Sequence, residues 1–315
     1  MRLMIGLRAT TMELIIIAND RNMKYTILTL SLLFSFSLDA QHIMLGSGDG
    51  PPTAPALNLL LDDYPGAAAA FSLRELTTSW AGKAVVRVRE SGGNTQQDFT
   101  AAEVTDGTLA TFCGSNDGFV VTWYDQSGNG SDATQSTAAD QGLIVASGTL
   151  NTQDGLPAID FNDDYYSISP SLTTTSGISS VFAVVENDNS STFRTIVRGS
   201  NVGAMQVRLS NNNTTLQFLR AGQSLIQQLT GVPTSTNMIV TSIADAAGVF
   251  LRANTVDIQG TKAPSINVQD IAYLSNFSSP EALVGNMQEV IIYTSDQSAN
   301  RASIETDINS HYTIY

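Results

Sequence analysis

Oxygen-bearing side chains occupy alternate positions in one short stretch of the chain, DQSGNGSD. Asp125, Ser127 and Asn129 are its first, third and fifth residues and a glycine is its sixth, as in the first half of a calcium-binding loop. The twelfth position holds Ser136 in place of the bidentate glutamate of such a loop. Two interpretations follow: a calcium site formed by Asp125, Ser127, Asn129 and Asp132, or a tight turn in which Asp125 accepts hydrogen bonds from backbone N–H groups. The missing glutamate favours the turn.

Aromatic side chains could supply flat surfaces for the C–H faces of sugar rings. Tyr165 and Tyr166 are neighbours, and successive side chains of an extended strand point to opposite faces. One of the two tyrosines should therefore be exposed and could contact a ligand. Trp123 lies within the β-prone run FVVTWY, which favours a place in the core over a place in a ligand site.

Histidine and cysteine chemistry has little basis in this sequence. His42 and His311 are the two histidines, and Cys113 is the single cysteine. A serine–histidine triad, a zinc site and an intramolecular disulfide are therefore disfavoured. No glycine loop that could cradle phosphate opens a helix, so a nucleotide is not expected. We expect no cofactor, with calcium as the exception left open above.

The charge balance limits the partners. The chain has 29 acidic and 15 basic residues, a net charge of -14, which would repel a phosphate backbone. Nucleic acid is therefore not an expected partner. Charged residues make up only 14% of the chain, so neutral polar side chains must supply much of its solubility, as in many secreted β-proteins.

The N-terminal region carries a targeting pattern. Met23 and Lys24 precede the apolar run YTILTLSLLFSFSL, which is followed by Asp39 and Ala40. We expect residues 1–40 to be an upstream extension plus a signal peptide cleaved after Ala40, and the rest to be secreted, periplasmic or at the cell surface, by bacterial export. A membrane anchor is the alternative, although the run is short for a span of ~20 residues. Membrane contact is expected only through this export segment.

Short β-prone runs between turn signals dominate the chain after residue 56. Several alternate apolar and polar residues, the period of a sheet with one buried face, and many such strands predict a β-sandwich. The runs are AVVRVR, FVVTWY, AIDF, SVFAVV, TIV, MQVRL, LQFL, MIVTSI, VFLR, IAYL and VIIY.

Helices are predicted only at residues 67–76 and 299–309. In the second, Ile304 and Ile308 lie four residues apart and should pack on the sheet, with Ser298 as the N-cap. Residues 41–56 are rich in glycine, proline and serine and are expected to form a flexible leader. No repeat or linker interrupts residues 57–315, which predicts a single domain.

Two segments together resemble the catalytic domain of the arabinofuranosidase B family. The first is AFSLREL, followed by VVRVR; the second is FCG leading to WYDQSGNG, with Thr134-Gln135 after a short spacer. The segment GNMQEVIIY and the final helix are similar to the closing part of laminin-G and concanavalin A-like sandwiches. The resemblance covers residues 58–315. It implies an all-β, lectin-like (concanavalin A/laminin-G type) β-sandwich with few short helices that handles glycans outside the cell.

The resemblance also implies retaining hydrolysis, with a carboxylate nucleophile and a carboxylic acid ~5 Å apart. The segment that corresponds to the family's nucleophile is GAMQV, where Gln206 stands, and the segment for its acid/base is LSNF, where Asn276 stands. Neither side chain is a carboxylate. The family's adjacent cysteine pair is also missing, since Cys113 belongs to another segment.

These departures favour a protein that binds a polysaccharide or other glycan without cutting it, with arabinose-containing glycans among the candidates. The candidate ligand-binding residues are Tyr165, Tyr166, Trp123, Gln206 and Asn276. An active retaining α-L-arabinofuranosidase that uses other carboxylates stays open, and so does a structural or adhesive sandwich with no sugar site. The other carboxylates are Asp160, Asp163, Asp164, Glu186, Asp188, Asp257, Asp270 and Glu289, of which Glu289 is expected to face solvent from a strand.

Overall fold

The computed structural model describes residues 59–174, 177–186, 193–200, 205–210, 214–220, 224–234, 236–261, 269–277 and 281–315. The targeting segment, the leader and Asp188 lie outside the described residues. Leu57–Tyr315 form one compact unit. None of the described helices combines the length and the apolar composition needed to cross a membrane.

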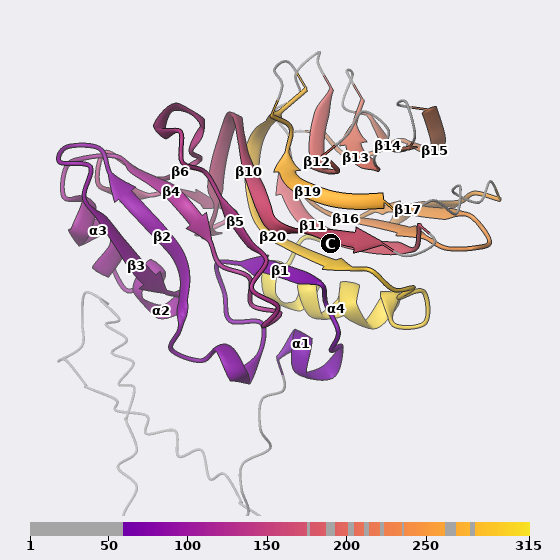
Figure 1. Ribbon diagram of the computed structural model, residues 1–315, viewed down its shortest axis with the longest axis horizontal. Helices are drawn as coiled ribbons and strands as arrows, with labels where there is room; N and C mark the ends of the chain where they lie inside the picture. Colours follow the sequence, from indigo (N-terminus) through magenta and orange to yellow (C-terminus); the bar gives the residue numbers. More distant parts are fainter. Residues whose placement is uncertain are drawn as a thin grey trace, which may run out of the picture. The chain divides into compact units, whose positions relative to one another are not determined.

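The central strands of the first sheet are buried on both faces. Its antiparallel strands are, in order, β1 (Ala69–Ser72), β20 (Leu283–Tyr293), β11 (Ser179–Glu186), β16 (Asn237–Ala244), β17 (Val249–Ala253) and β18 (Val256–Gln259). One face of this sheet, with Val181 and Val290, enters the main core. The other, with Phe182 and Ile291, is covered by α1 (Leu60–Asp63) and α4 (Arg301–Tyr312) (Figure 1).

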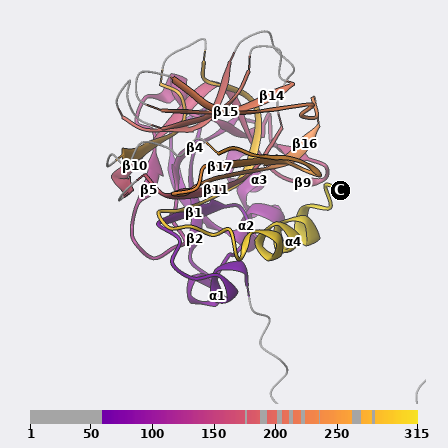
Figure 2. The same cartoon turned by 90° about the vertical axis from the view of Figure 1, so that its right-hand side faces the viewer.

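The second sheet packs one face on the main core, and Arg198, Gln206 and Arg208 on its other face are also buried. Its strands are, in order, β19 (Gln269–Ser275), β12 (Arg194–Arg198), β13 (Gln206–Leu209), β14 (Thr215–Arg220) and β15 (Ser224–Thr230). Val197, Val207 and Leu274 point into the main core. Their neighbours along the strands therefore point to the opposite face. Figure 2 shows β14 and β15 at the end of the molecule opposite to α1 and α4.

The long strand β10 (Ile159–Thr174) joins the sheets. Its first part pairs with β20 through Asp164, and its second part pairs with β19 from Tyr165 onward. The change of partner occurs beside Asp163, whose φ of 65° lies in the left-handed region. Strand β10 therefore brings the ends of β19 and β20 next to each other.

A third group of strands completes the main core. Its strands are β3 (Gln96–Thr100), β2 (Ala84–Glu90), β4 (Gly118–Trp123), β6 (Leu143–Ala146) and β7 (Thr149–Leu150), with β5 (Asp132–Thr134) between β4 and β10. The short elements are α2 (Ala101–Thr105), α3 (Thr108–Cys113), the 3-10 turns Thr78–Trp80 and Ala138–Asp140, and the hairpin of β8 (Thr152–Gln153) and β9 (Leu156–Pro157).

The predicted all-β sandwich with few short helices is confirmed, and every predicted β-run lies in a strand. The C-terminal helix is confirmed as α4, where Ile304 and Ile308 are buried against the first sheet. Its N-cap is Asn300, so the prediction of Ser298 as the N-cap was wrong. The helix predicted at residues 67–76 was also wrong. Those residues include β1, which pairs with Glu289–Ile292, because strand pairing outweighs the helix propensity of an alanine-rich run.

Candidate functional site

The two positions at which the resemblance implies carboxylates lie beside one arginine in the folded chain. Arg198 ends β12, and strand pairing sets it opposite Gln206 of β13 on one side and Tyr273 of β19 on the other. Paired residues of neighbouring strands point to the same face, here the one turned away from the main core. Arg198 Nη1 also donates a 2.6 Å hydrogen bond to Asn276 Oδ1.

The side-chain amides of Gln206 and Asn276 are both fixed by hydrogen bonds. Gln206 Nε2 donates to Thr195 Oγ1 at 2.6 Å, and Asn276 Nδ2 donates to Glu281 Oε2 at 3.3 Å. Both residues are buried, with exposed fractions of 5% and 1%. Such amides can orient other groups and form hydrogen bonds, but they cannot serve as a nucleophile or as a carboxylic acid.

Three aromatic rings border Arg198. The ring centroids of Tyr273 and Phe277 are 5.1 Å apart, and Tyr165 lies 6.2 Å from Tyr273 and 6.5 Å from Phe277. The guanidinium carbon of Arg198 lies 4.6 Å from the centroid of Phe277, a cation–π contact. Phe277 is 46% exposed, which is unusual for a phenylalanine. We refer to the cluster of Tyr165, Arg198, Gln206, Tyr273, Asn276 and Phe277 as the Arg198 site.

The backbone around Asn276 is set by an unusual conformation. Ser275 has a φ of 65°, which a residue with a side chain seldom adopts. Its hydroxyl accepts a 2.7 Å hydrogen bond from the N–H of Leu283, and the residue pairs with Tyr165 of β10. The left-handed conformation redirects the chain at the end of β19, so Asn276 lies against Arg198.

A second arginine stands on the same face. Arg208 is two residues along β13 from Gln206, so its side chain points the same way. Its Nη1 lies 3.5 Å from Glu281 Oε1, and its Nε donates to Gln217 Oε1 at 3.1 Å. Burial lowers the pKa of Arg198 and of Arg208, and the charge of Glu281 opposes that effect. Arginine stays protonated regardless, so the face carries positive charge.

The structure divides the aromatic candidates. Tyr165 is half-buried in the Arg198 site, whereas Tyr166 is fully buried, donates to Val120 O and accepts from the N–H of Gly142. One of the two tyrosines was predicted to be exposed, and Tyr165 is only partly so. Tyr166 was wrong as a ligand-binding candidate. Trp123 was wrong as well. It is fully buried in the main core with Phe71 as its ring neighbour, because its strand runs through the centre of the third strand group.

The DQSG stretch forms the predicted turn. Asp125 Oδ1 accepts the N–H groups of Ala70 and Ser127, each at 2.9 Å. Oδ2 accepts the hydroxyl of Ser127 at 2.8 Å and the N–H of Ser131 at 3.0 Å. Asp132 Oδ1 in turn accepts the N–H of Asp125 at 2.9 Å. The carboxylate of Asp125 therefore already accepts four hydrogen bonds and that of Asp132 accepts one.

The neighbouring residues also hold the turn in place. The amide of Asn129 donates to Ala67 O at 2.9 Å, and Gly128 and Gly130 have φ values of 85° and 73°. Gln126, the next residue of the motif, donates to the carbonyl oxygens of Ser72 and Arg74. Within the described part of the chain, no group of three His, Cys, Asp or Glu residues could hold a metal ion.

A comparison of calcium-loaded and calcium-free protein tests the turn. We expect the same melting temperature in 1 mM calcium chloride and in excess chelator, because an ion would have to displace the hydrogen bonds to Asp125. A bound ion with a Kd of about 10 µM would instead stabilise the fold by about 2.7 kcal/mol at that concentration. A rise of several degrees with calcium, abolished in an Asp132→Asn variant, would establish the calcium site.

A separate group of carboxylates lies on β10 and β11. Burial raises the pKa of Asp164 to about 6, and the nearby charges of Asp160, Asp140 and Asp163 add to the rise. Burial, with the charge of Glu186 second, also raises the pKa of Asp160. An acid with a raised pKa beside an ionised carboxylate is the pattern of glycosidase catalysis.

The raised pKa of Asp164 has a consequence for stability. The unfolded chain ionises this carboxyl near pH 3.8, the folded chain near pH 6. The native state is therefore disfavoured progressively as the pH rises between these values. Asp164→Asn keeps an acceptor for the N–H of Asn162 and removes the buried charge. We expect it to raise the free energy of unfolding by up to about 3 kcal/mol at pH 7.5 and by nothing at pH 3.5, measured by urea denaturation at both values. A gain of equal size at both pH values would contradict this account.

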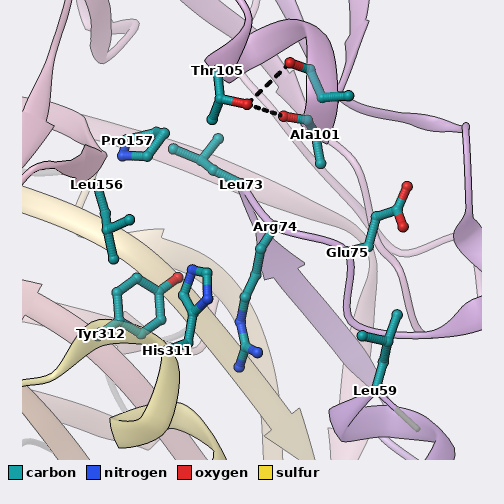
Figure 3. Close-up of a pocket in the computed structure, with 11 residues that line it drawn as sticks. Leu59, Leu73, Arg74, Glu75, Ala101, Thr105, Leu156, Pro157, His311 and Tyr312 are labelled. Carbon is teal, nitrogen blue, oxygen red and sulfur yellow. Dashed lines mark hydrogen bonds between the residues drawn. The ribbon is translucent and has the colours of Figure 1, made fainter. Parts of the chain in front are cut away.

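A cavity of about 470 Å³ lies elsewhere in the fold, between α2, α4, the β8–β9 hairpin and the chain after β1 (Figure 3). Arg74, His311 and Tyr312 line one side of it, and Leu73 and Leu156 contribute apolar surface. Burial and the charge of Arg74 lower the pKa of His311. None of the residues predicted as functional lines this cavity.

Beside the cavity, Glu289 is fully buried and not solvent-facing as predicted. Strand pairing places it on the face covered by α4, where Arg74 Nε donates to its carboxylate at 2.8 Å. Ser72 Oγ and the hydroxyl of Tyr312 donate to the same carboxylate at 2.9 and 3.2 Å. The network joins β1, β20 and α4.

Sequence reasoning missed half of the Arg198 site. Arg198, Tyr273 and Phe277 were not predicted as functional, and neither were the neighbouring Arg208 and Glu281. One signal was present: Arg208 lies inside the predicted β-run MQVRL, and Arg198 directly follows the run TIV. Two other carboxylate candidates have partners elsewhere. Asp257 forms an ion pair with Arg252, and Asp270 accepts a hydrogen bond from the backbone N–H of Ser200.

Comparison with known proteins gives structural neighbours only. No protein-family model matches the chain, and no curated protein matches it in sequence. A mutant GH54 α-L-arabinofuranosidase soaked with 4-nitrophenyl α-L-arabinofuranoside is similar in structure, with a TM-score of 0.56 and 16% identity over 77% of this chain. An arabinofuranosidase complexed with arabinofuranosyl-α-1,2-xylobiose has a TM-score of 0.52 and 16% identity over the same share. The matches span 62% of the length of each of these two proteins. At this identity the likeness concerns the fold alone: the chain has an all-β fold similar to that of these two proteins.

Proposed function

We propose that this protein is an exported glycan-binding sandwich that uses the Arg198 site and does not hydrolyse its ligand. One observation carries the proposal. The two positions at which the family resemblance implies catalytic carboxylates, Gln206 and Asn276, come together around Arg198 as buried amides. The arrangement keeps hydrogen-bonding groups at those positions and lacks the two carboxyl groups that retaining hydrolysis needs.

The aromatic border of the site supports binding. Phe277 is exposed and packs against Tyr273 in a tilted pair and against Tyr165 edge-to-face, so an apolar surface lies next to charged and amide groups. Sugar rings offer the matching combination of C–H faces and hydroxyl groups. The structural neighbours are arabinofuranosidases, so glycans with arabinofuranosyl residues are the first ligands to test.

The test combines binding with hydrolysis. The purified chain is applied to a glycan array and incubated with 4-nitrophenyl α-L-arabinofuranoside and with arabinan, and released nitrophenol and arabinose are measured. We expect an array signal and no release. The double variant Gln206→Glu with Asn276→Asp restores two carboxylates beside Arg198, and Gln217→Glu on β14 is the matched control. Release by the double variant alone would support descent from a hydrolase site.

Release by the wild-type protein would overturn the non-hydrolytic proposal. The carboxylates of β10 and β11 would then be the candidates, because burial raises the pKa of Asp164 to about 6. Loss of that activity in Asp164→Asn, with Asp270→Asn as a control, would assign the acid. Silence in both the array and the hydrolysis assay would leave a structural or adhesive role.

A further inference from the structure

The positive charge of the Arg198 site stands out against the charge of the chain. The protein has a net charge of -14, yet Arg198 and Arg208 lie on the same face of one sheet, where they are 9% and 7% exposed. Among the described residues, Glu281 is the carboxylate beside these arginines. Its Oε1 lies 3.5 Å from Arg208 Nη1, and its Oε2 accepts a hydrogen bond from Asn276 Nδ2. Two guanidinium groups therefore share one carboxylate in that part of the structure.

The two arginines have hydrogen-bonding capacity left over. Each guanidinium group carries five N–H donors in a planar fork. Arg198 uses Nε for Gly199 O and Nη1 for Asn276 Oδ1, and Arg208 uses Nε for Gln217 and Nη1 for Glu281. In the parts of the chain that the structure describes, Nη2 of either arginine has no hydrogen-bond acceptor. Both side chains are held in place by aromatic rings, Arg198 by Phe277 and Arg208 by Phe193 at 3.7 Å.

A positioned guanidinium fork matches the two oxygens of a carboxylate. Burial strengthens the attraction, because a partly buried pair is screened less by water and salt than an exposed pair. The exposed ring of Phe277 lies next to this charge and can pack against a sugar ring. A neutral sugar would leave the excess positive charge uncompensated.

We propose that the Arg198 site recognises a glycan that carries carboxylate groups, that is, one containing uronic acid residues. The inference rests on the proposed function and adds the class of sugar. The sugar carboxylate forms ion pairs with Arg198 and Arg208, and the sugar ring packs on Phe277.

Isothermal titration of the whole chain with oligogalacturonate and with its methyl ester tests the proposal. The two ligands share the sugar and differ in charge. We expect the acid to bind at least tenfold more tightly than the ester, and Arg198→Gln and Arg208→Gln each to remove most of that difference. Arg87→Gln is the matched control, since this arginine is exposed, pairs with Asp98 on β2–β3 and should leave the difference unchanged. Urea denaturation of each variant verifies that it folds.

The outcomes separate the two proposals. Equal affinity for the acid and the ester, or preference for a neutral arabinan, would overturn the uronate inference and leave glycan binding in place. A preference for the acid that persists in both site variants would also overturn it. Absence of binding to the acid, the ester and every neutral glycan of the array would overturn the proposed function itself.

Discussion

Arg74→Met is expected to lower the free energy of unfolding by about 3–5 kcal/mol, because it leaves the buried carboxylate of Glu289 without its cation. Glu289 is fully buried, and Arg74 contacts it through Nε at 2.8 Å and Nη2 at 3.1 Å. Ser72 and Tyr312 would still donate to it, but neither carries a positive charge. Urea denaturation followed by far-UV circular dichroism measures the change.

The control for this prediction is an exposed pair of the same chemistry. Arg87 Nε lies 2.7 Å from Asp98 Oδ1, and both side chains are 43% exposed. Arg87→Met should therefore cost no more than about 1 kcal/mol. The double variant Arg74→Met with Glu289→Met should be more stable than Arg74→Met alone, since replacing both partners removes the buried charge. A double variant that is less stable than the single one would show that the carboxylate needs no cation.

Asp125→Ala should lower the free energy of unfolding by roughly 2–6 kcal/mol. The substitution removes the acceptor of the N–H groups of Ala70 and Ser131, both of which are buried, and each unsatisfied donor costs about 1–3 kcal/mol. Those bonds fasten β1 to the DQSG turn, so we also expect faster hydrogen exchange at Ala70 and Phe71.

Asp106→Ala is the control for Asp125. Asp106 also accepts a backbone N–H two residues later, that of Thr108, but in an exposed turn. Water can replace the lost acceptor there, so the variant should match the wild type. Asp125→Asn should fall between the two, because its amide nitrogen faces donors where Asp125 offers an oxygen. Equal stability of Asp125→Ala and Asp106→Ala would contradict a structural role for the motif.

The strands could be predicted from sequence because their signal is local. Runs such as VFAVV and MIVTSI are β-branched and apolar, and the first sheet buries both of their faces. The helix predicted at residues 67–76 failed because the acceptor that holds Ala70 is Asp125, 55 residues away. Local propensity depends on neighbouring residues alone and therefore cannot indicate such a distant partner.

The site was predictable only in part. The resemblance indicated Gln206 and Asn276, and the alternation of side chains indicated one of Tyr165 and Tyr166 without saying which. Arg198 could not be found in this way, because its contact with Asn276 spans 78 residues of sequence. The burial of Glu289 was hidden for the same reason. Its surroundings come from β1 and from α4, at opposite ends of the described chain.

The most direct test of the central claim is a titration of the best-bound glycan of the array into the wild type, Phe277→Ala and Tyr315→Ala. Phe277 and Tyr315 are almost equally exposed, 46% and 47%, but only Phe277 belongs to the Arg198 site. The account predicts that Phe277→Ala weakens binding about tenfold or more, as truncation of a central aromatic contact does, and that Tyr315→Ala leaves it unchanged. Equal affinities for all three proteins would contradict a glycan site at Arg198.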